Sequence, residues 1–253
     1  MIRTFRPAAE AAPSKPPRRD KPEMTLDRVL SRAGLASRTV AAGWIAAGRV
    51  QVDGRTLDDA QAWVVPARQR ILLDGAPLQP VRRLYWALHK PVGVITSHGD
   101  PQRRPTIYDV VGKRASWYFP VGRLDQDTSG LLLLTNDSTF AEQVANPAVK
   151  VEKIYQARTE AGLSDAEVER LRQGLDIGRG ERSAPARAHR LRRAPAGTWV
   201  ELVLREGKNR QVRRMFEALG HQVIALERVQ IGKLKLGDLA AGAVRAIRPS
   251  DVL

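Results

Sequence analysis

The sequence contains no cysteine, and only four of its 253 residues are histidine. The absence of cysteine excludes disulfide bonds, thiol nucleophiles and cysteine-ligated metals, and it is consistent with a reducing cytoplasm. The histidines are dispersed along the chain, and neither a Walker loop nor a dinucleotide-binding glycine loop is found. We therefore predict that the protein uses no metal ion and no organic cofactor.

Long apolar runs are also missing. Residues 131–134 are four consecutive leucines, far fewer than the roughly 20 residues that a membrane-spanning helix requires. The basic N-terminus, rich in proline and alanine, lacks the apolar core of a signal peptide, although its composition is compatible with a transit peptide. We expect a cytoplasmic protein that does not contact a membrane. We also expect the protein to be a monomer.

Acidic residues are outnumbered, since 27 Asp and Glu stand against 42 Lys and Arg, for a net charge of +15. This charge favours a polyanionic partner, because binding to phosphates releases condensed counterions. A basic protein from a GC-rich genome is the alternative interpretation, since arginine and alanine are plentiful. The composition therefore favours, without proving, a nucleic-acid partner.

Two regions precede the largest part of the chain. Residues 1–23 hold five prolines and no apolar periodicity, which predicts a disordered basic tail. Residues 24–80 predict a small module with one helix up to Gly34 and a second from Ser37 to Gly48. Hairpin turns are expected at Asp53-Gly54 and Asp74-Gly75.

A larger domain is predicted for residues 85–253, after a short linker at residues 80–84. Strands are expected at residues 85–88, 92–95, 131–134, 153–159 and 199–204. Helices are expected at residues 139–144, 164–171 and 211–219. Strands joined by short turns, with few helices, predict an α+β fold with a mostly antiparallel sheet and flanking helices.

The most specific motif is residues 121–136, a polar loop that carries Asp125 and Asp127 and leads into the four leucines. Such a loop projects side chains from the end of a rigid sheet, a common place for catalytic groups. Because aspartates also form turns, the residues alone leave a structural interpretation open. Paired carboxylates would also suit a carbohydrate hydrolase, but that activity does not need a basic surface.

Two later segments carry further candidate residues. Tyr155 lies in a predicted strand, where its ring could stack on a base or pack in the core. Residues 206–216 form a loop of cations that leads into a helix, an arrangement suited to gripping phosphates. The alternative interpretation is that the cations of this segment only form a basic surface exposed to water.

In their order along the chain, these motifs resemble the rRNA pseudouridine synthases that carry an N-terminal S-four-type RNA-binding domain. Gly-Arg-Leu-Asp followed by Thr-Ser-Gly-Leu-Leu-Leu is similar to the family signature. The resemblance implies that Asp125 is the catalytic residue, and that Asp127, at a more variable position, belongs to the loop structure. We expect Arg123 to pair with Asp125 and keep this carboxylate ionised.

Two more segments follow the family pattern. Glu-Lys-x-Tyr implies that Tyr155 stacks on the target base, and Gln-Val-Arg implies that Arg213 holds Asp125 by a salt bridge. Leu-His-Lys-Pro-Val-Gly resembles the opening of the family's catalytic domain, with His89 in place of the usual asparagine. The resemblance therefore implies three catalytic-site residues: Asp125, Tyr155 and Arg213.

The front module resembles the S-four-type domain over residues 26–54, which implies a basic face for folded RNA. The residues expected to contact RNA are Arg28, Arg32, Arg38, Arg49, Arg123, Lys208, Arg210 and Arg214. The implied function is isomerisation of a uridine in ribosomal RNA, with the large subunit favoured over the small one. A non-catalytic RNA-binding factor in ribosome assembly is the alternative, and it would not need the three catalytic-site residues.

Overall fold

The computed structural model describes residues 23–79, 81–112, 117–194 and 197–253. The chain divides into two compact units, of which the first comprises residues up to Val29 and Arg38–Leu78. The second comprises Leu30–Ser37 and Gln79–Leu253. The predicted tail lies outside the described residues except for Glu23. No helix in the described ranges is both long and apolar enough to span a membrane.

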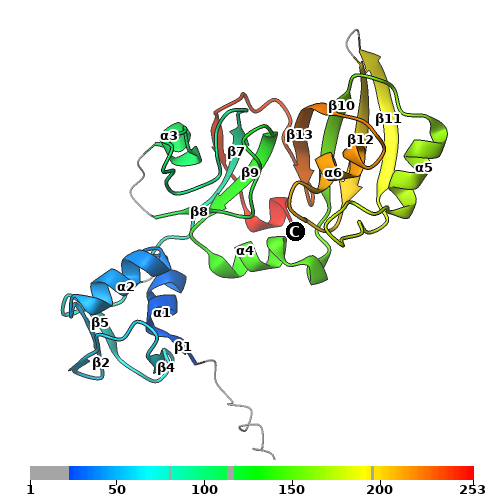
Figure 1. Ribbon diagram of the computed structural model, residues 1–253. Coiled ribbons are helices and arrows are strands. Elements are labelled where there is room, and N and C mark those ends of the chain that lie inside the picture. The colour runs from blue at the N-terminus through cyan, green and yellow to red at the C-terminus, as the bar shows by residue number, and fades with distance from the viewer. Residues whose placement is uncertain (1–22, 80, 113–116, 195–196) are drawn as a thin grey trace, which may run out of the picture. The chain divides into compact units, whose positions relative to one another are not determined.

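The N-terminal part of the described chain combines two helices with short antiparallel strands (Figure 1). The helices are α1 (Leu26–Arg32) and α2 (Arg38–Ala46). The strands are β1 (Met24–Thr25), β2 (Val50–Val52), β3 (Arg55–Thr56), β4 (Trp63–Val64), β5 (Ile71–Leu73) and β6 (Ala76–Pro77). Both predicted hairpin turns are confirmed, because Asp53, Gly54, Asp74 and Gly75 all have the positive φ that such turns require.

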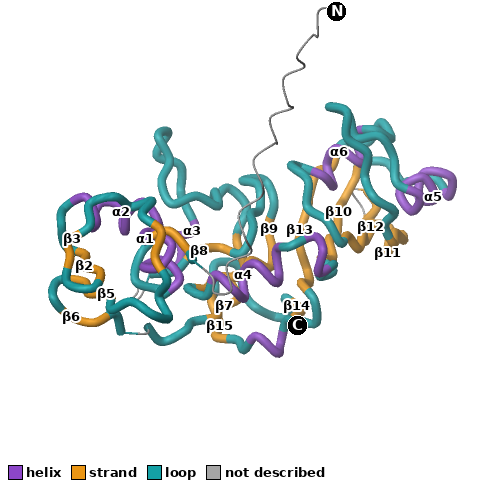
Figure 2. Tube along the Cα trace, turned by 90° about the horizontal axis from the view of Figure 1, so that it is seen from below, coloured by secondary structure: helices purple, strands orange, loops and turns teal. Residues whose placement is uncertain are grey.

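The larger unit is built on one extended sheet, whose described strands follow the order β11-β12-β10-β13-β9-β7-β15. Figure 2 shows β9, β13, β10, β12 and β11 succeeding one another across this unit. The strands are β7 (Tyr85–Lys90), β8 (Phe119–Pro120), β9 (Ser129–Thr135), β10 (Lys153–Thr159), β11 (Arg187–Ala194), β12 (Gly197–Leu204), β13 (Val223–Ile231), β14 (Leu234–Lys235) and β15 (Val244–Ala246). Of the described pairings, only β9 with β13 is parallel, so the predicted α+β fold with a mostly antiparallel sheet is confirmed.

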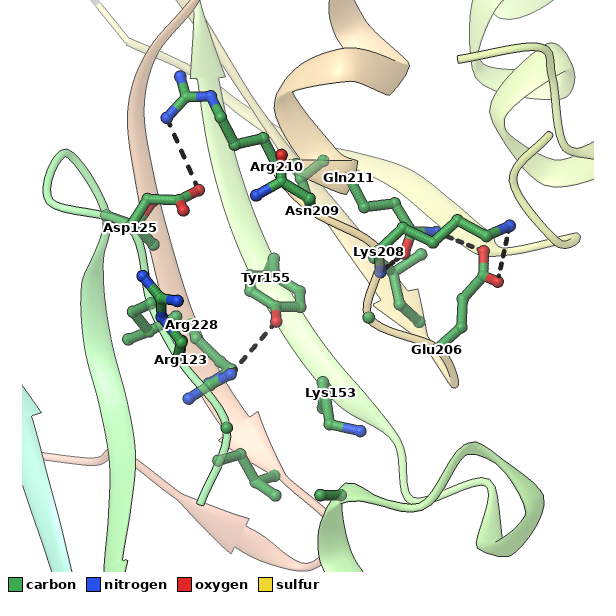
Figure 3. A pocket seen from close by; sticks show the side chains of 18 of the residues that line it. Arg123, Asp125, Lys153, Tyr155, Glu206, Lys208, Asn209, Arg210, Gln211 and Arg228 are labelled. Carbon is green, nitrogen blue, oxygen red and sulfur yellow. Dashed lines mark hydrogen bonds and ion pairs between the residues drawn. The ribbon is translucent and has the colours of Figure 1, made fainter. Parts of the chain in front are cut away.

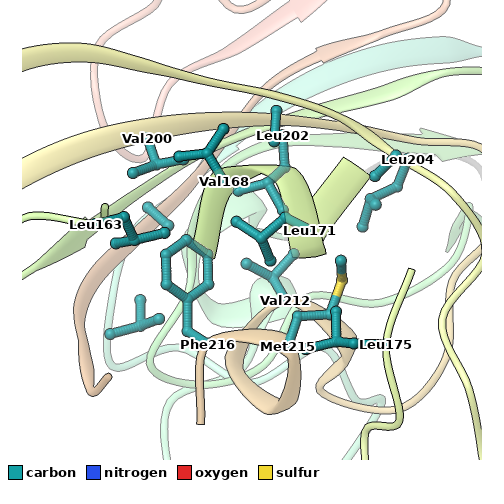
Figure 4. Close-up of a cluster of buried hydrophobic side chains, with 14 of the residues drawn as sticks. Leu163, Val168, Leu171, Leu175, Val200, Leu202, Leu204, Val212, Met215 and Phe216 are labelled. Carbon is teal, nitrogen blue, oxygen red and sulfur yellow. The ribbon is translucent and has the colours of Figure 1, made fainter. Parts of the chain in front are cut away.

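Few helices accompany this sheet. They are α3 (Ile107–Val111), α4 (Ser138–Ala145), α5 (Asp165–Gln173) and α6 (Gln211–Glu217), with 3₁₀ turns η1 (Pro147–Val149) and η2 (Pro249–Asp251). Ser164 caps α5 as predicted, in a reciprocal pair with Glu167. Both α5 and α6 pack their apolar residues against β10 and β12 and form the largest core, around Leu171, Leu202 and Phe216 (Figure 4). The start of α6 is therefore fixed relative to the sheet.

The strands of the larger unit differ from the predictions at several positions. The strand expected at residues 92–95 is absent, because Gly93 has a left-handed φ of 87°, and within this segment only Ile95 forms an isolated bridge, to Thr106. Both β11 and β13 were not predicted. Charged residues interrupt the apolar pattern of both strands. The β13 strand pairs with β10 and β9, which are remote in sequence, whereas β11 pairs with β12, which follows it directly.

The parallel pairing of β9 with β13 depends on Gly130. A Cβ atom at this position would lie 2.3 Å from the carbonyl oxygen of Arg228, and the backbone has a φ of +107°. Only glycine permits this close approach. The pairing places the loop before β9 beside the side chains of β13 and β10.

Candidate active site

Asp125 lies in the loop between β8 and β9, and its neighbours anchor that loop. Leu124 is buried, and Thr96 Oγ1 donates to its carbonyl oxygen at 2.9 Å and accepts from its amide at 3.2 Å. The amide of Thr128 donates to the carbonyl oxygen of Asp125 at 3.1 Å. The Asp125 side chain remains 35% exposed. A carboxylate in a fixed place is therefore accessible to a ligand.

Asp125 and Tyr155 line the same cavity, which has a volume of about 410 Å³ (Figure 3). Tyr155 extends from β10, its ring packs against two apolar clusters, and its hydroxyl accepts a hydrogen bond from Arg228 at 3.3 Å. Ligand pockets typically have volumes of about 300–1,000 Å³, and this cavity lies within that range. The structure brings together these two predicted site residues, which are far apart in the sequence.

Arg210 brings a cation to the Asp125 carboxylate. It precedes α6 in the left-handed conformation, with a φ of 48°. One of its nitrogens lies 3.7 Å from Asp125, and the other terminal nitrogen lies 3.2 Å from Asp127. The hydrogen bond to Asp127 and the charges of both carboxylates raise the pKa of Arg210. This predicted RNA contact therefore lies at the edge of the candidate active site, with 40% of its side chain exposed.

Arg213 does not make the predicted salt bridge to Asp125. Its Nε lies 3.1 Å from the carboxylate of Asp127, as an ion pair without hydrogen-bond alignment. Its Nη2 donates to the Asp127 carbonyl oxygen at 2.7 Å, and its Nη1 donates to that of Val223 at 2.8 Å. The reason is its position one turn into α6, beneath the later part of the loop. Arg213 thus fastens the loop that carries Asp125 and Asp127 to β13, and burial lowers the pKa of Arg213.

Two further predicted contacts differ from the structure. Arg123 lines the cavity as an exposed side chain, but it makes no ion pair with Asp125 among the described residues. Arg214 is buried, and its guanidinium binds the carbonyl oxygens of Ile177 and Gly178 and the carboxylate of Glu181. This arrangement argues against the RNA contact expected for Arg214, which stays a prediction. The sequence could not reveal which arginine of α6 faces inward.

Lys208 and its loop are held by Glu206. The Lys208 ammonium lies 3.2 Å from the Glu206 carboxylate and also donates to the carbonyl oxygen of Arg182. Glu206 in addition accepts from Gln211 at the start of α6. These contacts position the loop that presents Arg210, and they partly neutralise the Lys208 cation. No cluster of three or more metal-binding side chains occurs within the described ranges.

The arginines of the first module that are predicted to contact RNA differ in whether a carboxylate pairs with them. Arg28 is exposed, and no ion pair engages it within the described part of the chain. Arg38 donates to Asp27 at 2.8 Å. Arg49 makes two hydrogen bonds to Asp74, at 2.8 and 2.6 Å, and lies over the ring of Trp44. Arg32 is half-buried at the end of α1. The Arg28 charge is therefore the most available for a phosphate.

Lys90, for which no role was predicted, lies beneath the loop that carries Asp125 and Asp127. It is fully buried, and its ammonium donates to the carbonyl oxygens of Pro91 at 2.9 Å and Thr128 at 2.8 Å. Burial lowers its pKa to about 8, although the charges of Asp127 and Asp125 act in the opposite direction. Because Thr128 directly follows Asp127, Lys90 fixes the end of the loop that carries both carboxylates.

The lowered pKa of Lys90 predicts a dependence of stability on pH. Below pH 8 this lysine is protonated in both states, and the folded state bears the cost of a buried cation. Between pH 8 and its ordinary value of 10.5 only the unfolded chain keeps the proton. The free energy of unfolding should therefore rise across this range by up to about 3 kcal/mol through this group. Urea unfolding should show a larger rise in the wild type than in Lys90→Met, which keeps the contribution of other groups such as Lys153, whose pKa burial also lowers. An equal rise in the two proteins would contradict the prediction.

Comparison with known families agrees with this geometry. A family model described as RNA pseudouridylate synthase matches residues 84–218, and an S4 domain model matches residues 24–62. The chain belongs to the RNA pseudouridylate synthase family, whose members are isomerases. The family resemblance and the enzyme class predicted from the sequence are confirmed.

Individual relatives share nearly the whole chain. The ribosomal large subunit pseudouridine synthase B of Bacillus subtilis (strain 168) is 36% identical over 229 residues, which cover 90% of this chain and 93% of that protein. An uncharacterized RNA pseudouridine synthase of Aquifex aeolicus (strain VF5) is 35% identical, over 91% and 92% of the two chains. A crystal structure of a pseudouridylate synthase matches with a TM-score of 0.65 and 27% identity, over 90% of this chain and 97% of that one.

Proposed function

We propose that this enzyme isomerises a specific uridine of ribosomal RNA to pseudouridine, with large-subunit rRNA favoured, and that Asp125 is the catalytic residue. The observation that carries the proposal is an accessible carboxylate on an anchored loop, which lines a nucleoside-sized cavity together with Tyr155. The named Bacillus subtilis relative supports the choice of large-subunit rRNA. A small-subunit target is the second candidate.

The chemistry follows from what the cavity offers. The N1–C1′ bond of the uridine must break, the uracil must turn, and a C5–C1′ bond must form as the C5 proton leaves. Asp125 can begin this sequence as a nucleophile at C1′ or as a base toward a sugar proton. The substrate and product are isomers, so the overall reaction consumes no oxidant and no second substrate. We therefore propose that no cofactor takes part.

Tyr155 and Arg210 would act on the bound nucleotide. A uridine must leave its stack to reach Asp125, at a cost of a few kcal/mol. The Tyr155 ring provides a flat surface for the extruded base. Arg210 would move from its two carboxylates to a phosphate of the RNA backbone, since arginine binds both types of anion through the same donors. Arg213 would position the loop without contact with the RNA.

We further propose a division of labour along the chain. Residues 24–80 would supply affinity and targeting, and residues 85–253 would carry out the chemistry, in a cytoplasmic monomer. The module contributes exposed arginines, of which Arg28 has the least engaged charge. RNA helices of A-form hide their base edges, so contacts with the backbone and shape should dominate.

The test of the function is a map of pseudouridine in ribosomal RNA. Chemical probing of rRNA from a strain without this gene should reveal one or a few lost sites in the large-subunit RNA. The wild-type gene should restore them, whereas a gene encoding Asp125→Asn should not. An unchanged map would contradict the rRNA substrate, and restoration by the Asp125→Asn gene would favour a non-catalytic assembly factor.

A single charge in the module should affect binding in a predictable way. Arg28→Ala should weaken RNA affinity and lower the slope of log affinity against log salt by about 0.7–0.9, which corresponds to one lost phosphate contact. Arg49→Ala is the matched control, because Asp74 already neutralises this arginine, and its slope should change less. Binding titrations at several salt concentrations measure both. A larger change of slope for Arg49→Ala than for Arg28→Ala would show that the RNA contacts the module at Arg49 and not at Arg28.

A further inference from the structure

Arg228 is a buried cation that has no carboxylate partner in the part of the chain that the structure describes. Only 3% of the residue is exposed, yet it lines the cavity that contains Asp125 and Tyr155. Its Nε donates to the carbonyl oxygen of Leu131 at 2.8 Å, and its Nη1 donates to the Tyr155 hydroxyl at 3.3 Å. Its Nη2 is buried and has no hydrogen-bond partner. A buried charged donor without an acceptor costs free energy in a folded protein. An acceptor atom on a bound ligand would remove this cost.

Lys153 adds a second cation to the same cavity. It lies two residues before Tyr155 on β10, on the same face of the sheet. Its ammonium makes one long hydrogen bond, to the carbonyl oxygen of Val151 at 3.4 Å. Burial and the nearby charge of Arg228 both lower the pKa of Lys153. The fold therefore holds two like charges close together, against their mutual repulsion.

The acids of the cavity do not neutralise this pair. Among the described residues, Asp125 forms its ion pair with Arg210, and Glu206 forms its own with Lys208. In the close-up, Asp125 lies toward one end of the Tyr155 side chain, while Arg228 and Lys153 lie toward its hydroxyl end (Figure 3). The cavity is thus polarised, with a carboxylate on one side of the tyrosine and two uncompensated cations on the other.

We infer that Arg228 and Lys153 bind the uracil at its carbonyl oxygens and stabilise it as an anion when it detaches from the sugar. This inference rests on the proposed pseudouridine synthase activity. The ribose would lie at Asp125, where C1′ reacts, and the uracil would reach toward the tyrosine hydroxyl. Both cations would then be electrostatic catalysts in contact with the reacting base.

The electron count of the step explains why cations belong there. When the N1–C1′ bond breaks, its electron pair stays with the uracil, which becomes an anion with its charge spread over N1, O2 and O4. C1′ is left to bond to Asp125 or to share a double bond with C2′, and the charge on the base is the same in both routes. When C5 then bonds to C1′, the bond from C1′ to Asp125 breaks, or C2′ takes back its proton, and the charge on the base is neutralised. The C5 proton then leaves while N1 gains a proton, so the base stays neutral. The stabilised anion exists only between the breaking of the N1–C1′ bond and the formation of the C5–C1′ bond.

Single-turnover kinetics at saturating RNA test the inference on the full-length protein. Lys153→Met and Arg228→Gln should each slow pseudouridine formation by about 10²-fold while RNA affinity changes little, because the interaction strengthens only as the bond breaks. Lys153→Met is the safer variant for folding, since this ammonium makes only one long contact. Arg158→Gln is the matched control. Arg158 lies on β10 over Trp199 and not in the cavity, so its loss removes one charge and should leave the rate unchanged.

A second substrate separates leaving-group stabilisation from a structural role. In RNA with 5-fluorouridine at the target, the electron-withdrawing fluorine stabilises the uracil anion without help from the protein. The gap between wild type and Lys153→Met should therefore narrow by about tenfold. The readout is formation of the C5-linked product, in which the reaction stops because C5 has no proton to release. A structural defect would slow both substrates equally.

The outcomes distinguish this inference from the proposed function. If the wild type forms no pseudouridine in the rRNA fragment, the proposed function fails. If the wild type is active and both variants retain its rate, or lose only RNA affinity, the cations bind backbone phosphate or nothing, and the inference is wrong. Equal slowing on uridine and 5-fluorouridine RNA would likewise overturn it.

Discussion

Asp125→Asn is expected to lower single-turnover pseudouridine formation by about 10⁴-fold or more, while RNA affinity stays near that of the wild type. Asparagine is almost the same size, so the anchored loop around Leu124 and Thr128 should persist. It can neither attack C1′ nor accept a proton as a carboxylate does. The rate of isomerisation of a defined rRNA fragment, with binding measured separately, tests this expectation.

Asp127→Asn is the control for that experiment. Asp127 forms ion pairs with Arg210 and Arg213, but 47% of its side chain is exposed. Exposed ion pairs contribute at most about 1 kcal/mol, and asparagine can still accept a hydrogen bond. The expected loss is therefore about tenfold or less. If Asp127→Asn were inactive and Asp125→Asn active, the assignment of the catalytic residue would be wrong.

Arg213→Ala is expected to have the second largest effect, on both stability and turnover. The substitution removes the donors to the carbonyl oxygens of Asp127 and Val223 and the buried partner of the Asp127 carboxylate. Hydrogen bonds to charged groups contribute about 1.5–3 kcal/mol each, so the loss of these two should lower the unfolding free energy by about 3 kcal/mol or more. Because the loop that carries Asp125 then loses its attachment to β13, turnover by the remaining folded protein should also fall, by at least about 10²-fold.

A neighbouring arginine separates these two effects. Arg214 is equally buried on α6, but its guanidinium contacts Ile177, Gly178, Glu181 and the carbonyl oxygen of Asn209, and none of these belongs to the loop that carries Asp125 and Asp127. Arg214→Ala should therefore destabilise the protein to a similar extent, while the folded fraction keeps its turnover. Chemical denaturation and single-turnover rates of both variants provide the comparison. Equal loss of turnover in the two variants would show that Arg213 has no special role at the loop.

The elements that could be predicted from the sequence have local signals. Ser164 begins α5 because its side chain and that of Glu167 satisfy each other's amides, and both residues lie within four positions. The strand at Lys153–Thr159 was predicted at its observed bounds. The β13 strand has no comparable signal, since its pairing with β9 depends on Gly130, almost 100 residues away. No short segment of the sequence therefore shows that β13 contributes to the candidate site.

The candidate site shows the same limit. Asp125, Tyr155 and the arginines of α6 could be found by their motifs, because each motif is a continuous segment. Which arginine meets which carboxylate depends on the rotation of α6 and on where the loop crosses it, and neither is encoded in a short segment. This is why Arg213 was predicted to pair with Asp125 and is found with Asp127. The sequence predicts no role for Arg228, because the feature that distinguishes it is a buried Nη2 without a hydrogen-bond partner, which only the structure shows.

The parallel pairing of β9 with β13 has a consequence for the newly made chain. Ribosomes release a protein from its N-terminus, so the S4 module and Asp125 leave the exit tunnel long before Arg228 does. Contacts between remote segments also form late in folding, since a long loop must close first. A nascent chain can therefore fold the part that recognises RNA before it completes the proposed catalytic cavity. The order of synthesis therefore allows RNA recognition to arise before the proposed catalysis. A chain terminated before β13 would have only RNA recognition.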